Sequence, residues 1–364
     1  MVNPEMVVLA REYRNLTQEE LARKITVSQG TISKIEGDFA PDRAKELIGR
    51  IAGVLQFPVE FFYQPGERLG FGSSSFYYRK RVSISAADRK RISGVVNILR
   101  LSVKRLLTAV ELEPSRDLPL LHIEDFGGSP EHVARALRSA WNLPDGPIKN
   151  VTALIESAGV IVAPCDFGTS AMDATSLRLT DMPPIIFISK TIPGDRWRFT
   201  LAHELGHLVM HDLPRESMEP EADQFAAEFL MPAGELKSQF DRYARIRLQD
   251  LANLKPYWKV SMAALIMRAN ALGNLSESQA RSLWIQMAQA GYKIKEPVPL
   301  AVERAENFEG LFQYYLKELG YSVNEIAKLL AIFPEEFSTL GVEALSPKVR
   351  PILRPVPQGA ANEQ

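Results

Sequence analysis

The sequence predicts a mainly helical chain with one α+β region near its middle, an all-helical N-terminal domain and a helical C-terminal region. Two observations carry this prediction. Most apolar side chains recur with the spacing of amphipathic helices, whereas β-branched apolar runs typical of buried strands occur at residues 159–163 and 184–189. With 364 residues, 46% of them hydrophobic and 24% charged, the chain is long enough for two or three globular domains.

Composition excludes several classes of protein. No apolar run is long enough to cross a membrane, and residues 1–14 carry too many charges for a signal peptide. The only cysteine, Cys165, cannot form an intrachain disulfide. We therefore expect a cytoplasmic protein with no membrane partner.

Residues 1–66 predict an all-helical domain. Thr17 caps one short helix, and Glu20 completes its capping box. Ser28 caps a second short helix, which Gly37 ends. Two short helices joined by a tight turn form a helix-turn-helix unit.

The motif Thr-Gln-Glu-Glu-Leu-Ala at 17–22, followed by Val-Ser-Gln-Gly-Thr-Ile-Ser-Lys-Ile-Glu-Gly at 27–37, resembles the Xre/phage-repressor family of DNA-binding domains. This resemblance implies that residues 28–36 form a recognition helix for double-stranded DNA. The expected DNA contacts are Gln18, Ser28, Gln29, Thr31, Ser33 and Lys34. Gly30 departs from the family pattern, and a net charge of −2 over residues 1–67 is low for DNA binding. The alternative is therefore that this domain serves for dimerisation or for docking a partner. The sequence leaves undecided whether the chain forms a homodimer.

The segment 67–113 carries the positive charge of the chain. Residues 68–105 hold ten basic side chains and one acidic side chain, a net charge of +9. Three aromatic residues precede three basic residues at 76–81, and one long helix is expected over 88–113. One hypothesis is a surface that follows a nucleic-acid backbone, single strands included, with aromatic side chains available to stack. The alternative is a linker helix packed on the next domain. Candidate nucleic-acid contacts are Arg79, Lys80, Arg81, Arg89, Lys90 and Arg91.

Residues 114–290 predict the α+β domain. Helices are expected over 131–141 and 151–157, and both β-branched runs are expected to form strands. A third short strand, at 175–179, is expected to pair between them. A longer helix follows these strands.

This longer helix contains His203-Glu204-Leu-Gly-His207. Histidines four residues apart lie on one face of a helix, so both imidazoles can bind one metal ion. Glu204 then lies beside the metal, where it can act as a general base. The pattern is the H-E-x-x-H motif of zinc proteases. A structural metal site or an inactive relic is the alternative.

A catalytic zinc needs a third protein ligand. Glu219, Glu221 and Asp223 lie on a second predicted helix that Pro232 ends. Glu219 and Asp223 share one face, so one can bind the metal while the other accepts the N–H of a ligand histidine. Glu221 is the alternative ligand, because Pro220 could shift the start of this helix.

His-Glu-Leu-Gly-His followed by Glu-x-x-Ala-Asp-x-Phe-Ala-Ala-x-x-Leu-Met-Pro resembles the ImmA/IrrE family of metallopeptidases, over roughly residues 75–300. The resemblance favours Glu219 as the third ligand of Zn²⁺. It implies an endopeptidase whose partner is a helix-turn-helix repressor, cleaved to derepress stress, mobile-element or phage-defence genes. The alternative is a DNA-binding regulator or antitoxin-like repressor whose metallopeptidase-like domain senses or binds a partner without cleavage.

Two regions complete the sequence predictions. Cys165 follows a predicted strand. One hypothesis is that its thiolate is an inhibitory zinc ligand in the water position, and the alternative is a small buried residue. Residues 291–345 predict a helical C-terminal subdomain, and the polar, proline-rich residues 346–364 predict a disordered tail.

Overall fold

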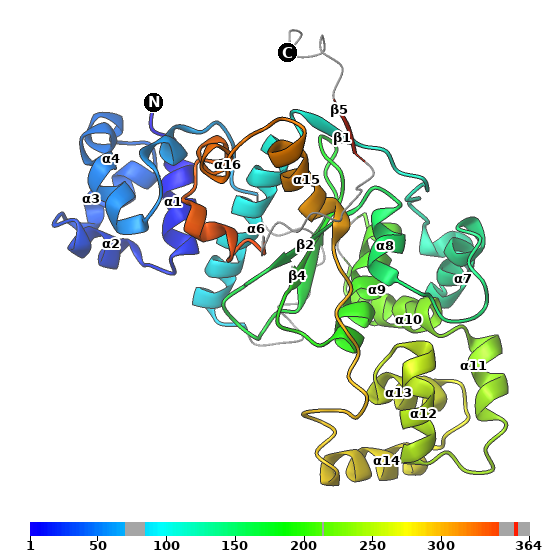
Figure 1. Ribbon diagram of the computed structural model, residues 1–364. Coiled ribbons are helices and arrows are strands. Elements are labelled where there is room, and N and C mark those ends of the chain that lie inside the picture. Colours follow the sequence, from blue (N-terminus) through cyan, green and yellow to red (C-terminus); the bar gives the residue numbers. More distant parts are fainter. Residues whose placement is uncertain (70–83, 213–214, 342–352, 356–364) are drawn as a thin grey trace.

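The computed structural model describes residues 1–69, 84–212 and 215–341, and the backbone of 353–355. Helices dominate, and a three-stranded mixed sheet lies at the centre. Figure 1 shows the N-terminal helices on one side of this sheet and a unit of helices α11 to α14 on another. The prediction of a mainly helical fold with one α+β region and a helical N-terminal domain is confirmed.

The N-terminal domain contains the two predicted short helices with their caps. Thr17 and Glu20 form the capping box of the first helix, and the Ser28 side chain accepts a hydrogen bond from the Thr31 backbone N–H at the start of the second. Both helices lie at the outer edge of the molecule (Figure 1). The domain consists of α1 (Pro4–Tyr13), α2 (Gln18–Lys24), α3 (Gln29–Glu36), α4 (Pro41–Leu55) and the 3-10 helix η1 (Val59–Tyr63).

Helix α6 (Ala86–Leu106) connects this domain to the rest of the chain and is buried along most of its length. It crosses α1 so closely that a Cβ atom on Gly94 would lie 2.7 Å from the backbone N and Cα of Tyr13. One continuous apolar core includes α1, α6, one face of the sheet and the C-terminal helices. The N-terminal domain is therefore packed firmly against its neighbours.

This close crossing predicts opposite effects for two glycine substitutions. Gly94→Ala should destabilise the protein by about 1–3 kcal/mol, because the new methyl group forces α1 and α6 apart. Gly49→Ala on α4 is the matched control, since a Cβ there meets nothing within 4 Å. That variant should gain up to about 1 kcal/mol from helix propensity alone. Guanidinium unfolding measures both, and equal effects would contradict the close crossing.

Two predictions near α6 were wrong. The helix expected over 88–113 ends at Leu106, because Thr108 donates its backbone N–H and its hydroxyl to the Arg105 carbonyl and turns the chain. Strand β1 (Val110–Leu112) follows and pairs antiparallel with β5 (Leu353–Pro355), inside the tail expected to be disordered. The composition of the tail gives no indication that its backbone pairs with a strand so far away in the sequence. The rest of that tail and residues 70–83 lie outside the described residues.

The central sheet has the order β2 (Ile161–Cys165), β4 (Ile185–Ser189), β3 (Ala174–Leu177). β4 runs parallel to β2 and antiparallel to β3. The prediction that the third strand pairs between the two apolar runs was therefore wrong, because β4 is central. Burial gives the physical reason, since an almost wholly apolar run suits the strand that is covered on both faces.

Side chains of the sheet alternate between two cores. Ile161, Ala163 and Cys165 of β2 belong to the core that contains α6. Val162, between them, belongs to a second core with α8 (Val151–Glu156) and α9 (Gly194–Met210). Successive side chains of a strand point to opposite faces of the sheet. Alternate residues of β2 therefore belong to alternate cores.

The remaining helices surround α9 or extend beyond it. Among the described residues, no helix is long and apolar enough to cross a lipid bilayer. These elements are η2 (Ile123–Phe126), α7 (Pro130–Ala140), α10 (Met218–Leu230), α11 (Ala233–Phe240), α12 (Leu248–Trp258), α13 (Met262–Ala271), α14 (Glu277–Gln289), α15 (Glu306–Lys317), α16 (Val323–Leu330) and η3 (Pro334–Phe337).

Residues 291–305, which we call the strap, return from α14 to α15. Glu296 of the strap accepts a hydrogen bond from Lys255 Nζ at 2.8 Å, and the same ammonium group lies 2.6 Å from Asp195 Oδ2 at the start of α9. Glu303 forms an ion pair with Arg198, one turn further along α9. These buried charge pairs connect the strap to the helix that carries the histidine motif.

Candidate metal centre

Helices α9 and α10 cross at the glycine of the histidine motif. A Cβ atom on Gly206 would lie 3.0 Å from the ring of Phe225, so the two helices approach closely there. The crossing brings Glu219 of α10 beside His203 and His207 of α9. Candidate ligands from two separate helices thus form one group of three residues.

The geometry of this group fits a single metal ion. The Nε2 atoms of His203 and His207 lie 3.0 Å apart, and each lies 3.4 Å from one oxygen of the Glu219 carboxylate. Bonds of roughly 2.0–2.1 Å in tetrahedral geometry would separate two ligand atoms by about 3.3 Å. Among the residues that the structure describes, these three form the group able to hold a metal. Glu221, the alternative ligand, is not part of it.

Asp223 orients the first histidine. Its Oδ1 lies 2.9 Å from His203 Nδ1, so the ring donates its Nδ1–H to the carboxylate. The lone pair of Nε2 then points toward His207 and Glu219. A carboxylate behind a ligand histidine fixes the tautomer and raises the basicity of the ring. The role of Asp223 behind a metal ligand stays a prediction, and this contact is consistent with it.

His211 orients the second histidine, a role that the sequence analysis missed. His211 Nε2 lies 2.9 Å from Glu221 Oε2, and its Nδ1 lies 2.9 Å from His207 Nδ1. If His211 donates to Glu221, its Nδ1 accepts the Nδ1–H of His207, whose Nε2 is then free to bind a metal. The i, i+4 spacing of the two histidines was the available signal.

Electrostatics favour a positive charge at the centre. Burial alone would lower the pKa of His203, but hydrogen bonds with Asp223 and Glu219 outweigh it and raise the pKa to about 10. Burial, together with neighbouring His207, lowers the pKa of His211 to about 4, which keeps this ring neutral. Burial opposes ionisation of Glu219, yet hydrogen bonds from both histidines lower its pKa. The two Nε2 atoms lie 3.0 Å apart, so a proton or a metal cation between them is needed to offset the repulsion of their lone pairs.

Glu204 is the remaining motif residue. It is buried, and its Oε2 has no hydrogen-bond partner among the described residues. An unpaired buried carboxylate oxygen is costly and uncommon in folded proteins. Such an atom beside the histidine pair suits a group that exchanges a proton with a bound water.

Cys165 lies in a different core from the metal group. It is fully buried at the end of β2, on the face of the sheet that packs toward α6. The histidine helix α9 packs on the opposite face. Burial also raises the pKa of the thiol, which disfavours the thiolate that a metal would bind. This placement matches the alternative of a small buried residue and does not bring Cys165 to the centre.

The predicted DNA contacts share one exposed surface around α3. Ser28, Gln29, Ser33 and Lys34 are exposed, while Thr31 and Gln18 are half-buried. Gln29 Nε2 donates a hydrogen bond to Gln18 Oε1 at 2.7 Å, which orients the two side-chain amides relative to each other. The contacts themselves stay a prediction, and their shared surface is consistent with it.

The basic segment uses much of its charge inside the protein. Arginines along α6 donate to backbone carbonyl groups at Ile84, Glu67 and Leu329; these donors are Arg89, Arg100 and Arg105. Lys90 is exposed and Arg91 is half-buried, whereas Arg79, Lys80 and Arg81 lie outside the described residues. Helix α6 therefore matches the alternative of a packed linker helix. Contact between this segment and nucleic acid stays a prediction.

The orientation of His203 can be tested with a neighbouring pair of substitutions. Asp223→Ala should weaken zinc binding by roughly 10–100-fold, because the ligand ring loses its acceptor. Gln224→Ala removes the next side chain along α10, which is exposed and is not one of the three ligands. It should bind zinc like the unsubstituted chain. Competition with a chromogenic chelator measures both affinities, and equal values would contradict the role of Asp223.

The fold and the site together define a metallopeptidase-like domain joined to a helix-turn-helix domain. Residues 155–270 match the family model described as the IrrE N-terminal-like domain, and residues 9–40 match the helix-turn-helix family model. The chain therefore contains both domains, and the second implies DNA binding. The first match is narrower than the range 75–300 over which the sequence resembles the ImmA/IrrE family. No curated protein matches the chain.

Proposed function

We propose that the protein is a zinc-dependent endopeptidase, fused to its own DNA-binding domain, that cleaves a helix-turn-helix repressor. The observation that carries this proposal is the convergence of His203, His207 and Glu219 beside the unpartnered Oε2 of Glu204. Two imidazoles and one carboxylate are the ligand set of several catalytic zinc sites in peptidases. The same geometry would serve a purely structural site less well, because such sites have four protein ligands.

The residues divide the chemistry among them. A zinc ion held by the three ligands would supply Lewis acidity that activates water and polarises a peptide carbonyl. Glu204 accepts a proton from the attacking water and passes it to the departing amine nitrogen. Asp223 and His211 hold the two ligand imidazoles with Nε2 directed to the centre. Burial of the group limits competing hydrogen bonds from solvent.

A repressor as substrate is supported by the domain combination. The sequence resemblance to ImmA/IrrE proteins implies this class of substrate, together with derepression of stress, mobile-element or phage-defence genes. The helix-turn-helix domain brings the peptidase-like domain to DNA, where repressors are bound. Close packing of α1 on α6 keeps the two domains in a fixed relation.

The direct test uses the full-length, zinc-loaded protein and, as candidate substrates, helix-turn-helix proteins of the same genome, beginning with any that a neighbouring gene encodes. Mass spectrometry should detect cleavage at one or a few peptide bonds. Chelation of zinc should stop cleavage, and added zinc should restore it. An intact repressor in the presence of a zinc-occupied enzyme would contradict the proposal for that substrate.

The second candidate function is a DNA-binding regulator or antitoxin-like repressor that cleaves nothing. The exposed surface of α3 favours it, because that surface could bind an operator without help from the metal centre. Lys34→Ala should weaken DNA binding and reduce the salt dependence by about one released ion if Lys34 contacts a phosphate. Titrations at several salt concentrations measure this slope, and an unchanged slope would remove Lys34 from the DNA surface.

A further inference from the structure

A cleft of about 710 Å³ begins beside the metal group. Asp223, which holds His203 through its Nδ1, lies in the wall of this cleft. Phe199, one turn before His203 on α9, lies in the same wall. Helices α9, α10 and α13 and the strap together surround the space, whose volume is typical of ligand pockets. The cleft therefore reaches the carboxylate behind His203, although His203, His207 and Glu219 are not among its lining residues.

The walls of the cleft are largely apolar and partly exposed. Ala227 and Ala264 face the space with Phe199, and Met267 of α13 exposes 61% of its surface. Ile294 on the strap is 96% exposed. Large apolar side chains left exposed around a concave surface indicate a binding partner more often than chance. A large apolar side chain of a partner would be removed from water here.

The charges around the cleft indicate that this partner also carries acidic side chains. Most of its ionic side chains are already paired: Lys255 with Asp195 and Glu296, Arg196 with Asp173, and Arg268 with Glu228. Lys293 and Lys295 of the strap are exposed and have no ion pair among the described residues. Glu131, on the wall of the cleft, also has no ion pair among the described residues. Two lysines and one glutamate leave a net charge of +1, and the positive charges lie together on the strap, where they complement acidic side chains.

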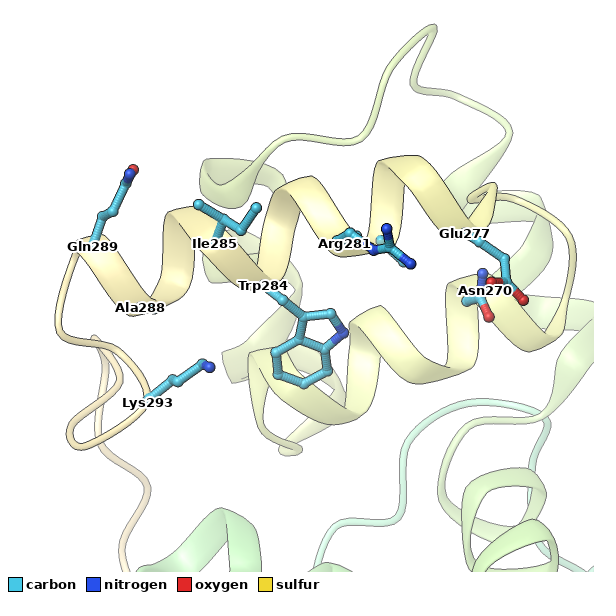
Figure 2. A pocket seen from close by; sticks show the side chains of 9 residues that line it. Asn270, Glu277, Arg281, Trp284, Ile285, Ala288, Gln289 and Lys293 are labelled. Carbon is cyan, nitrogen blue, oxygen red and sulfur yellow. The ribbon is translucent and has the colours of Figure 1, made fainter.

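A second hollow continues from the rim along α14. Its volume is about 520 Å³, and it shares Lys293 with the cleft. Figure 2 shows Trp284 projecting from α14 toward the helix that carries Asn270, with Lys293 on the following loop. An extended segment that passes Lys293 can therefore meet an aromatic side chain beyond the cleft.

We propose that the cleft binds a segment of the substrate polypeptide that places a large aliphatic or aromatic side chain beside the metal centre, with acidic residues next to it. This inference rests on the proposed peptidase function and names the class of sequence that the site accepts. The strap and α14 lie outside residues 155–270, which match the IrrE N-terminal-like domain. Specificity would then come partly from segments beyond the shared domain.

The test measures binding of short fluorescein-labelled peptides to the full-length Glu204→Gln chain, in which hydrolysis cannot remove the probe. One peptide has a central Leu and the other a central Asn, and both carry two neighbouring Glu residues. Fluorescence anisotropy should show about tenfold tighter binding of the Leu peptide, the value expected from burying its side chain. A version of the Leu peptide with Lys in place of Glu should bind more weakly.

Three variants locate this preference. Met267→Gln should reduce the preference for Leu, whereas Leu319→Gln should preserve it, because Leu319 is 41% exposed but lies outside the cleft. Lys293→Glu combined with Lys295→Glu should reverse the preference for acidic over basic flanks. Both lysines are exposed, so this double variant is expected to fold.

The outcomes separate the two proposals. Equal binding of the Leu and Asn peptides, or an unchanged preference in Met267→Gln, would overturn the inference about the cleft. A wild-type chain that binds the Leu peptide with this preference, yet cleaves neither peptide nor repressor, would overturn the peptidase function instead.

Discussion

Glu204→Gln is expected to reduce cleavage of the repressor by at least a hundredfold while zinc content and folding remain unchanged. General-base catalysis contributes roughly 10²–10⁴-fold to such reactions, and an amide cannot accept the proton. The substitution keeps the shape of the side chain. Because Glu204 Oε2 has no hydrogen-bond partner among the described residues, no contact to that oxygen is lost.

The measurement combines initial cleavage rates, zinc content by mass spectrometry and thermal unfolding. Glu318→Gln is the matched control, since this carboxylate is exposed at the end of α15 and far in sequence from the site. It should cleave at the rate of the unsubstituted protein. Cells that carry Glu204→Gln should also fail to derepress the controlled genes. Normal derepression in those cells would favour the regulator that acts without cleavage.

Glu219→Ala is expected to remove zinc from the protein, whereas Glu221→Ala is expected to retain it. The first substitution deletes a group within 3.4 Å of both ligand nitrogens. Its effect on affinity should exceed the roughly 10–100-fold that outer partners of ligands contribute. Glu221 contacts His211 rather than the ligand group, so its loss should cost no more than about tenfold.

Dialysis against a competing chelator, followed by metal analysis, distinguishes these two variants. The unsubstituted chain and Glu221→Ala should retain about one ion per chain under conditions that strip Glu219→Ala, given the larger loss expected for a direct ligand. The reverse order would exchange the roles of the two carboxylates. It would also contradict the crossing of α9 and α10 at Gly206 as the feature that selects the ligand.

The parts of the site that could be predicted depend on local helical geometry. His203 and His207 share a face because they are four residues apart, and the same spacing relates Glu219 to Asp223. The capping box of α2 and the N-cap of α3 are equally local, and the structure contains both. Each of these features needs only the chain within about one helical turn.

The parts that could not be predicted depend on which surfaces meet. Glu219 and Glu221 both lie in the first turn of α10, and only the crossing of α9 and α10 places Glu219 beside the histidines. His211 reaches His207 because the chain leaves α9 at that residue with extended backbone angles. His211 lies eight residues after His203, about 12 Å further along the helix axis, so it acts on the second histidine and is not a third ligand.

The sequence by itself determined the chemistry available to this protein: a histidine pair with its glutamate, carboxylates on a following helix, and a helix-turn-helix unit at the start. Only the tertiary structure decided which carboxylate joins the pair, that Cys165 lies on the far face of the sheet, and that β4 is the central strand. It also showed that Arg89, Arg100 and Arg105 near or on α6 donate hydrogen bonds to backbone carbonyl groups of the protein itself. The physical reason is that the helix repeat alone decides which side chains share one face of a helix. Which faces of two elements contact each other depends instead on the packing of residues far apart in the sequence.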